Sequence, residues 1–75
     1  MCGIVGILGK QPVALSIVEA LRRLEYRGYD SAGVALVADG HLATAKRAGK
    51  LVNLEDALEV EPLPAGTVGI GHTRW

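Results

Sequence analysis

The residue best suited to chemistry is Cys2, the only cysteine of the chain, which directly follows the initiator methionine. Met1 is normally removed when the next residue is small, and its removal would leave a thiol and a free α-amine on the same carbon. An α-amine has a reference pKa of about 7.7–8.0, so part of it is the free base near neutral pH. A terminal cysteine can therefore combine a nucleophile with a general base. The alternative is a buried, inert cysteine beside an apolar strand.

Two polar stretches could complete a site around that thiol. Residues 27–33 (RGYDSAG) begin with Arg27 and Gly28 and have the composition of a turn, so an ordinary surface turn is the simpler interpretation from spacing alone. Residues 71–75 (GHTRW) end in Arg74 and Trp75. An arginine fork matches the two oxygens of a carboxylate, although a surface salt bridge is its more common role. The lone histidine of this stretch is weak evidence for a cysteine–histidine pair.

Nucleotide and metal motifs are incomplete. Gly3, Gly6 and Gly9 are spaced G-x-x-G-x-x-G rather than G-x-G-x-x-G, although Asp30 stands at about the right distance for a ribose contact. A noncatalytic nucleotide-binding or interaction domain is therefore the alternative to an enzyme. No set of Cys and His residues has zinc-site spacing, so we expect no metal.

Composition limits the partners and the compartment. Eight basic and eight acidic residues give a formal net charge of zero, which argues against nucleic acid and membrane surfaces as partners. One cysteine cannot form an internal disulfide, and no segment approaches the roughly 20 apolar residues of a membrane span. We therefore expect a cytoplasmic location and one small domain with an aliphatic core.

Hydrophobic periodicity predicts the elements that position these groups. An apolar stripe marks a helix over residues 12–26, and Asn53 is the expected N-cap of a second helix over residues 54–60. Asp39-Gly40 predicts a two-residue hairpin turn. Apolar or alternating runs predict strands over residues 2–8, 33–38, 41–47 and 67–72. This order indicates an α+β or α/β fold, and the shortage of helices to cover the strands suggests a fragment of a longer protein.

Three stretches closely resemble class II (N-terminal nucleophile) glutamine amidotransferases: residues 2–6 (CGIVG), 21–33 (LRRLEYRGYDSAG) and 71–75 (GHTRW). The resemblance spans the chain, and the long middle motif between the other two makes it specific. The pair Arg74-Trp75 differs from the Arg-Tyr of the purine-pathway branch. Asparagine synthetases have Arg-Gly-Pro-Asp where residues 27–30 read RGYD. Both differences favour the branch that aminates fructose-6-phosphate.

The resemblance implies an α+β fold, the four-layer α/β/β/α sandwich of N-terminal nucleophile hydrolases. Residues 1–75 would be the N-terminal portion of a glutamine amidotransferase type-2 domain. The rest of that domain and a sugar isomerase domain would follow Trp75, and with them the Asn-Gly pair of the oxyanion hole. The chain alone is therefore expected to be inactive, and the full-length enzyme is expected to be a homo-oligomer.

The resemblance also implies the roles of the site residues. The Cys2 thiol would attack the glutamine carboxamide, with its own amine as base, and hydrolysis of the thioester would release glutamate. Arg74 would hold the glutamine α-carboxylate, and Trp75 would line or gate the ammonia path. Arg27 and Gly28 would lie beside the nucleophile and contribute mainly backbone groups. Ammonia would reach fructose-6-phosphate in the isomerase domain and give glucosamine-6-phosphate, without a cofactor.

Overall fold

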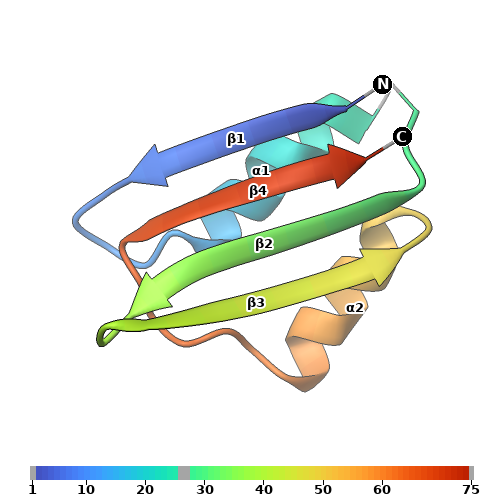
Figure 1. Ribbon diagram of the computed structural model, residues 1–75. Coiled ribbons are helices and arrows are strands. Elements are labelled where there is room, and N and C mark those ends of the chain that lie inside the picture. Colours follow the sequence, from blue (N-terminus) through green and yellow to red (C-terminus); the bar gives the residue numbers. More distant parts are fainter. Residues whose placement is uncertain (1, 26–27, 75) are drawn as a thin grey trace.

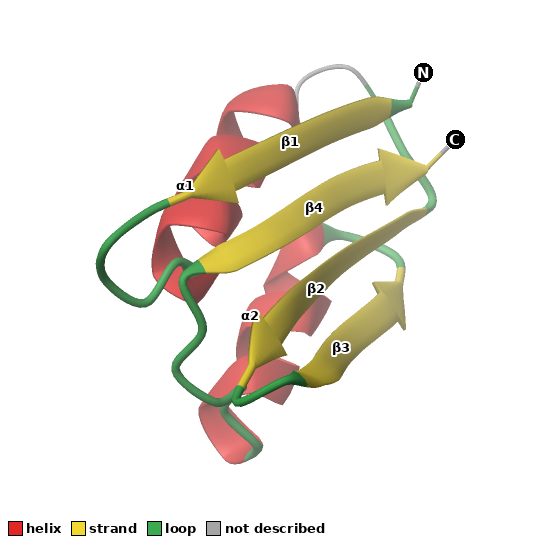
Figure 2. Cartoon of the chain, turned by 60° about the vertical axis from the view of Figure 1, so that its left-hand side comes forward, coloured by secondary structure: helices red, strands yellow, loops and turns green. Residues whose placement is uncertain are grey.

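A computed structural model describes residues 2–25 and 28–74 of the chain. Its elements are β1 (Gly3–Leu8), α1 (Ala14–Leu24), β2 (Ser31–Ala38), β3 (His41–Ala48), α2 (Leu51–Val60) and β4 (Val68–Arg74). The strands form one antiparallel sheet in the order β1-β4-β2-β3. Both helices pack on the same face of this sheet, as Figures 1 and 2 show. The expectation of a small α+β domain is confirmed.

The hydrophobic core lies between the helices and the sheet face that they cover. The predicted apolar stripe of α1 supplies Ile17 and Leu21, both fully buried. Close contact of α1 with β4 depends on Gly71, because a Cβ added there would collide with Ile17 and approach Leu21 to 3.2 Å. The other members of the core are buried aliphatic side chains: Val13, Val18, Ala32, Val34, Leu36, Ala38, Leu51 and Leu54.

The predicted hairpin is present between β2 and β3. Asp39 and Gly40 form its turn with positive φ angles of 53° and 76°, as a type I′ turn requires. The antiparallel register starts from the pair Ala38–His41 next to the turn. On β3 the side chains alternate as predicted, since Ala43 and Ala45 are half-buried toward the helices while their neighbours are exposed.

The second helix begins three residues earlier than predicted, at Leu51, so the assignment of Asn53 as its N-cap was wrong. Lys50 occupies the N-cap position and provides no side-chain cap. Instead, the phenolic oxygen of Tyr29 accepts a hydrogen bond of 2.6 Å from the backbone N–H of Leu51. Asn53 lies within the first turn and donates to the carbonyl oxygen of Ala48 at 3.0 Å. Local rules missed this start because the capping group comes from a residue distant in sequence.

The sheet face opposite the helices carries no covering element among the described residues (Figure 2), and we call it the open face. Successive side chains of a strand point to opposite faces of the sheet, so every second residue of each strand lies on the open face. Six exposed aliphatic residues of the sheet lie there, with 44–83% of their surface accessible: Ile4, Leu8, Val37, Leu42, Val68 and Ile70. A contiguous exposed apolar surface is typical of an interaction surface.

Candidate functional site

Cys2 and Arg74 lie next to each other at one end of the sheet. Gly3 pairs with Thr73 across β1 and β4, so Cys2 stands one residue before this pair and Arg74 one residue after it. Gly3 and Thr73 are buried against the helix side, so alternation directs Arg74, with Cys2 beside it, to the open face. The thiol is free and exposed. The structure thus brings together two of the predicted site residues from opposite ends of the chain.

The position of Cys2 depends on close packing behind it. A Cβ added to Gly3 would lie 2.7 Å from Cδ1 of Leu24 and 3.2 Å from Oγ1 of Thr73. The last turn of α1 therefore rests directly on the start of β1, and a larger residue at position 3 would displace the Leu24 side chain.

The open face changes in polarity along the strands. At the end that carries Cys2, Ser31 pairs with Arg74 across β2 and β4. His72 comes next, and its imidazole covers Gly33, where an added Cβ would lie 2.6 Å from Nε2. The opposite end is aliphatic, with Leu8 paired to Val68. Polar groups that could bind a ligand are therefore concentrated near the thiol.

Gly28 belongs to the segment that leads into β2, and it has a positive φ of 77°. Its N–H donates to the carbonyl oxygen of Glu25 at 3.4 Å. Two residues later, the N–H of Asp30 donates to the carbonyl oxygen of Arg74 at 2.6 Å. This bond ties the segment to the end of β4, at the end of the sheet where β1 begins (Figure 1).

The remaining two predicted substrate-binding residues, Arg27 and Trp75, lie outside the described residues. The nucleotide-binding alternative gains no support, because Gly3 and Gly6 lie within an antiparallel strand. A dinucleotide fingerprint instead needs a glycine-rich loop between a parallel strand and a helix. Within residues 2–25 and 28–74, no group of three or more His, Cys, Asp or Glu could hold a metal ion. No helix of the described part is long and apolar enough to cross a membrane.

Tyr29 follows Gly28 in the segment that leads into β2, and its contact with α2 could not be predicted from local sequence patterns. Its ring packs against the core cluster, and its hydroxyl caps α2. Burial raises the pKa of the Tyr29 phenol above its ordinary value of 10.0, and the hydrogen bond from Leu51 opposes this rise. The available signal was indirect: residues 48–50 (AGK) contain no Ser, Thr, Asp or Asn that could cap the helix.

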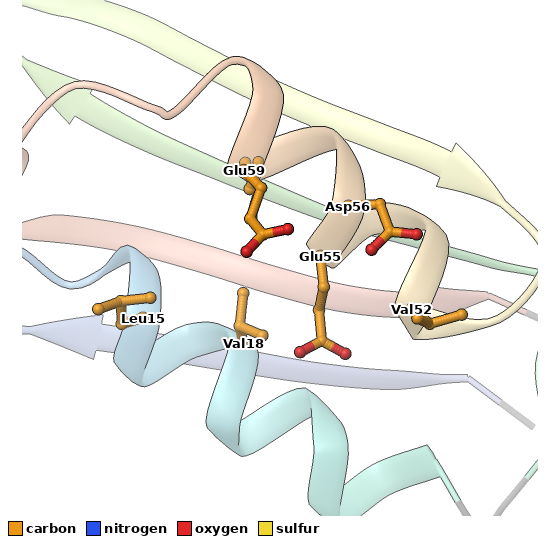
Figure 3. A pocket seen from close by; sticks show the side chains of 7 residues that line it. Leu15, Val18, Val52, Glu55, Asp56 and Glu59 are labelled. Carbon is orange, nitrogen blue, oxygen red and sulfur yellow. The ribbon is translucent and has the colours of Figure 1, made fainter.

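A groove lies between α1 and α2 on the helical side of the molecule. Leu15 and Val18 of α1 and Val52 of α2 supply its apolar walls. The carboxylates of Glu55, Asp56 and Glu59 lie over it, as Figure 3 shows, and Glu55 forms an ion pair with Arg22 of α1. None of the predicted site residues lines this groove, which is on the other side of the sheet from the open face.

The comparisons with known proteins identify relatives along the whole chain. It is 67% identical over all 75 residues to a glutamine–fructose-6-phosphate aminotransferase (isomerizing) of Streptomyces coelicolor. A protein of the same name from Rhizobium meliloti is also 67% identical, and one from Bradyrhizobium diazoefficiens is 65% identical. The predicted resemblance to these aminotransferases is confirmed over the whole chain. In each case the chain covers 12% of the relative's length. No family model matches the chain.

Proposed function

We propose that this chain forms the beginning of a glutamine-hydrolysing domain. In the full-length enzyme, this domain supplies ammonia for the conversion of fructose-6-phosphate to glucosamine-6-phosphate. The observation that carries the proposal is the 67% identity over all 75 residues to proteins named for this aminotransferase activity. The adjacent positions of Cys2, directly before β1, and Arg74, at the end of β4, support it, because the reaction needs a nucleophile near a carboxylate-binding group.

The chemistry begins when Met1 is removed and the α-amine of Cys2 is free. The amine takes the thiol proton as sulfur attacks the side-chain carbonyl carbon of glutamine. The tetrahedral intermediate then collapses, the C–N bond breaks, and the proton passes to the departing ammonia. Water next attacks the glutamyl thioester, which releases glutamate and restores the thiol. Each step uses groups already on Cys2, which is why no histidine partner is required.

Arg74 binds and orients the substrate in this proposal. Its guanidinium forms two parallel hydrogen bonds with the α-carboxylate of glutamine, and this geometry points the side-chain amide toward Cys2. Gly28 and Arg27 border the nucleophile and offer mainly backbone groups, while Trp75 lines the path by which ammonia leaves. The reaction needs no metal or organic cofactor.

The open face supports the further proposal that the complete domain is a four-layer α/β/β/α sandwich. One layer of helices and one sheet are present here, and six aliphatic side chains remain exposed on the uncovered side. A second sheet packed about 10 Å away would bury them. Cys2 and Arg74 would then lie at the edge of the space between the two sheets, where water is partly excluded.

The chain alone is expected to be nearly inactive. Asn53 is its only asparagine and leucine follows it, so residues 1–75 contain no Asn-Gly pair for the oxyanion hole implied by the resemblance. Loss of one oxyanion donor costs about 10²–10³ in rate. A glutaminase assay of the isolated chain checks this, and near-normal turnover would contradict it.

The decisive experiment uses the full-length protein and a glutamine analogue with an electrophilic side chain. Mass spectrometry should show that Met1 is absent and that the analogue forms a covalent bond with Cys2. The Cys2→Ala variant should lose both the labelling and the glutaminase activity. A native protein that retains Met1, or a Cys2→Ala variant with full glutaminase activity, would exclude the proposed mechanism.

A further inference from the structure

The N-terminus of α2 is capped from outside its own sequence. The first backbone N–H groups of a helix have no partner within the helix, and a side chain at the N-cap usually accepts one of them. Lys50 holds the N-cap position with extended backbone angles (φ −73°, ψ 158°) but has no acceptor group. The hydroxyl of Tyr29 takes this role by accepting the N–H of Leu51 at 2.6 Å.

Asp30, the residue after Tyr29, forms backbone hydrogen bonds with two other parts of the chain. The N–H of Asp30 donates to the carbonyl oxygen of Arg74 at 2.6 Å, and the N–H of Gly49 donates to the carbonyl oxygen of Asp30 at 2.7 Å. Tyr29 and Asp30 therefore connect the start of α2 to the end of β4. Figure 1 shows that the segment leading into β2 runs past the end of β4, on the side of the sheet where β1 begins.

The hydrogen bond between Tyr29 and Leu51 lies at the border of the hydrophobic core. Leu51, which donates the hydrogen bond, is 1% exposed, and the ring of Tyr29 packs against the cluster that contains Leu51. A hydrogen bond at the border of the core orders the segment more strongly than one between exposed side chains. The segment also includes Gly28, which has a positive φ of 77°.

From these contacts we propose that Tyr29 is a positioning residue for the glutamine site. Its bond to α2 fixes residues 28–30, and through Asp30 it fixes the main chain of Arg74, the carboxylate-binding residue. This inference rests on the proposed function. Loss of the hydroxyl is expected to weaken glutamine binding more than the chemical step, because Cys2 carries its own base and lies before β1, outside the segment that Tyr29 holds.

The test compares three variants of the full-length protein. Tyr29→Phe removes the hydroxyl and keeps the ring. Tyr29→Phe combined with Lys50→Asp gives α2 a local cap, which restores helix stability without restoring the tether to the segment. Asn53→Ala is the matched control, since it removes another hydrogen bond at the same helix end, to Ala48, and leaves residues 28–30 untouched.

We expect Tyr29→Phe to raise the KM for glutamine about 3- to 10-fold, as the loss of one hydrogen bond predicts, with kcat changed less than about twofold. Inhibition by glutamate should weaken by a similar factor, because glutamate carries the same α-carboxylate. Adding Lys50→Asp should recover the Tm but leave the KM raised. Asn53→Ala should lower the Tm without raising the KM. Alkylation of Cys2 by iodoacetamide, which needs no carboxylate site, should proceed at the wild-type rate in all variants.

Two results would overturn the inference. One is an unchanged KM in Tyr29→Phe, and the other is a KM that returns to normal with Lys50→Asp, which would make the contact purely stabilising. If Tyr29→Phe alone does not fold, the double variant still gives the decisive KM. Absence of glutaminase activity in the wild-type protein would instead reject the proposed function, so the two failures are distinguishable.

Discussion

The carbonyl oxygen of Arg74 accepts a hydrogen bond of 2.6 Å from the backbone N–H of Asp30. One residue ends β4 and the other immediately precedes β2, so this bond joins two of the three stretches that carry the resemblance. The third stretch begins at Cys2 and adjoins Arg74 through the pairing of β1 with β4. Three segments far apart in the sequence therefore meet at one end of the sheet.

Replacing Arg74 with lysine should impair substrate binding and leave the fold intact. The contact with Asp30 uses the main chain and persists in the variant. Lysine keeps the charge but lacks the planar fork that bonds both carboxylate oxygens. We expect the KM for glutamine in the full-length protein to rise about 10- to 100-fold, the equivalent of one charged hydrogen bond. Arg23→Lys on the exposed side of α1 is the control. An unchanged KM in Arg74→Lys would remove Arg74 from the site.

Replacing Gly71 with alanine should destabilise the protein through α1. The added methyl group would collide with Ile17, which is fully buried and cannot move freely. Overpacking of this kind costs about 1–3 kcal/mol of unfolding free energy. Denaturant unfolding of the full-length protein measures the cost, with Ser16→Ala on the exposed side of α1 as the control. Equal unfolding free energies for the two variants would show that α1 does not rest on β4 as described.

Much of this arrangement could be predicted from the sequence. The apolar stripe led correctly to α1, which spans Ala14–Leu24 within the predicted residues 12–26, and Asp39-Gly40 led to the hairpin, because both signals are local. Several boundaries were missed, among them the end of β4, which continues past the predicted residue 72 to Arg74. The predicted loop ended too late, since Ser31 already pairs with Arg74 and Ala48 in the sheet. The start of α2 was also missed, because its cap is supplied by Tyr29 through tertiary structure, which no local pattern around Leu51 records.

The site itself could be predicted only through the resemblance. Nothing in the spacing of Cys2 and Arg74 along the chain shows that they are neighbours, because the sheet order β1-β4-β2-β3 places the first and last strands side by side. The polar end of the open face likewise appears only when Ser31 and His72 are placed on their strands. Local patterns specified the elements, and long-range pairing created the site.

Alkaline pH should destabilise the protein partly through Tyr29. Burial raises the pKa of its phenol above 10.0, so above about pH 10 the unfolded chain loses this proton before the folded protein does. The folded state then binds more protons, and the free energy of unfolding falls as the pH rises toward the folded pKa. Unfolding of wild type and Tyr29→Phe between pH 8 and 11 isolates this contribution, because other groups titrate equally in both. A wild-type curve parallel to that of the variant would contradict the prediction.

The proposed second sheet predicts that a lysine at position 70 destabilises the full-length protein more than a lysine at position 60. Ile70 on the open face is 52% exposed here, whereas Val60 at the end of α2 is 87% exposed. A covering sheet would bury Ile70 and leave Val60 in solvent. In the full-length protein, Ile70→Lys should therefore cost more than about 3 kcal/mol of unfolding free energy, because it buries an unpaired charge. Val60→Lys should stay within about 0.5 kcal/mol, the usual range for surface changes. Equal small costs for both variants would mean that the open face remains uncovered, and the four-layer sandwich would then be excluded.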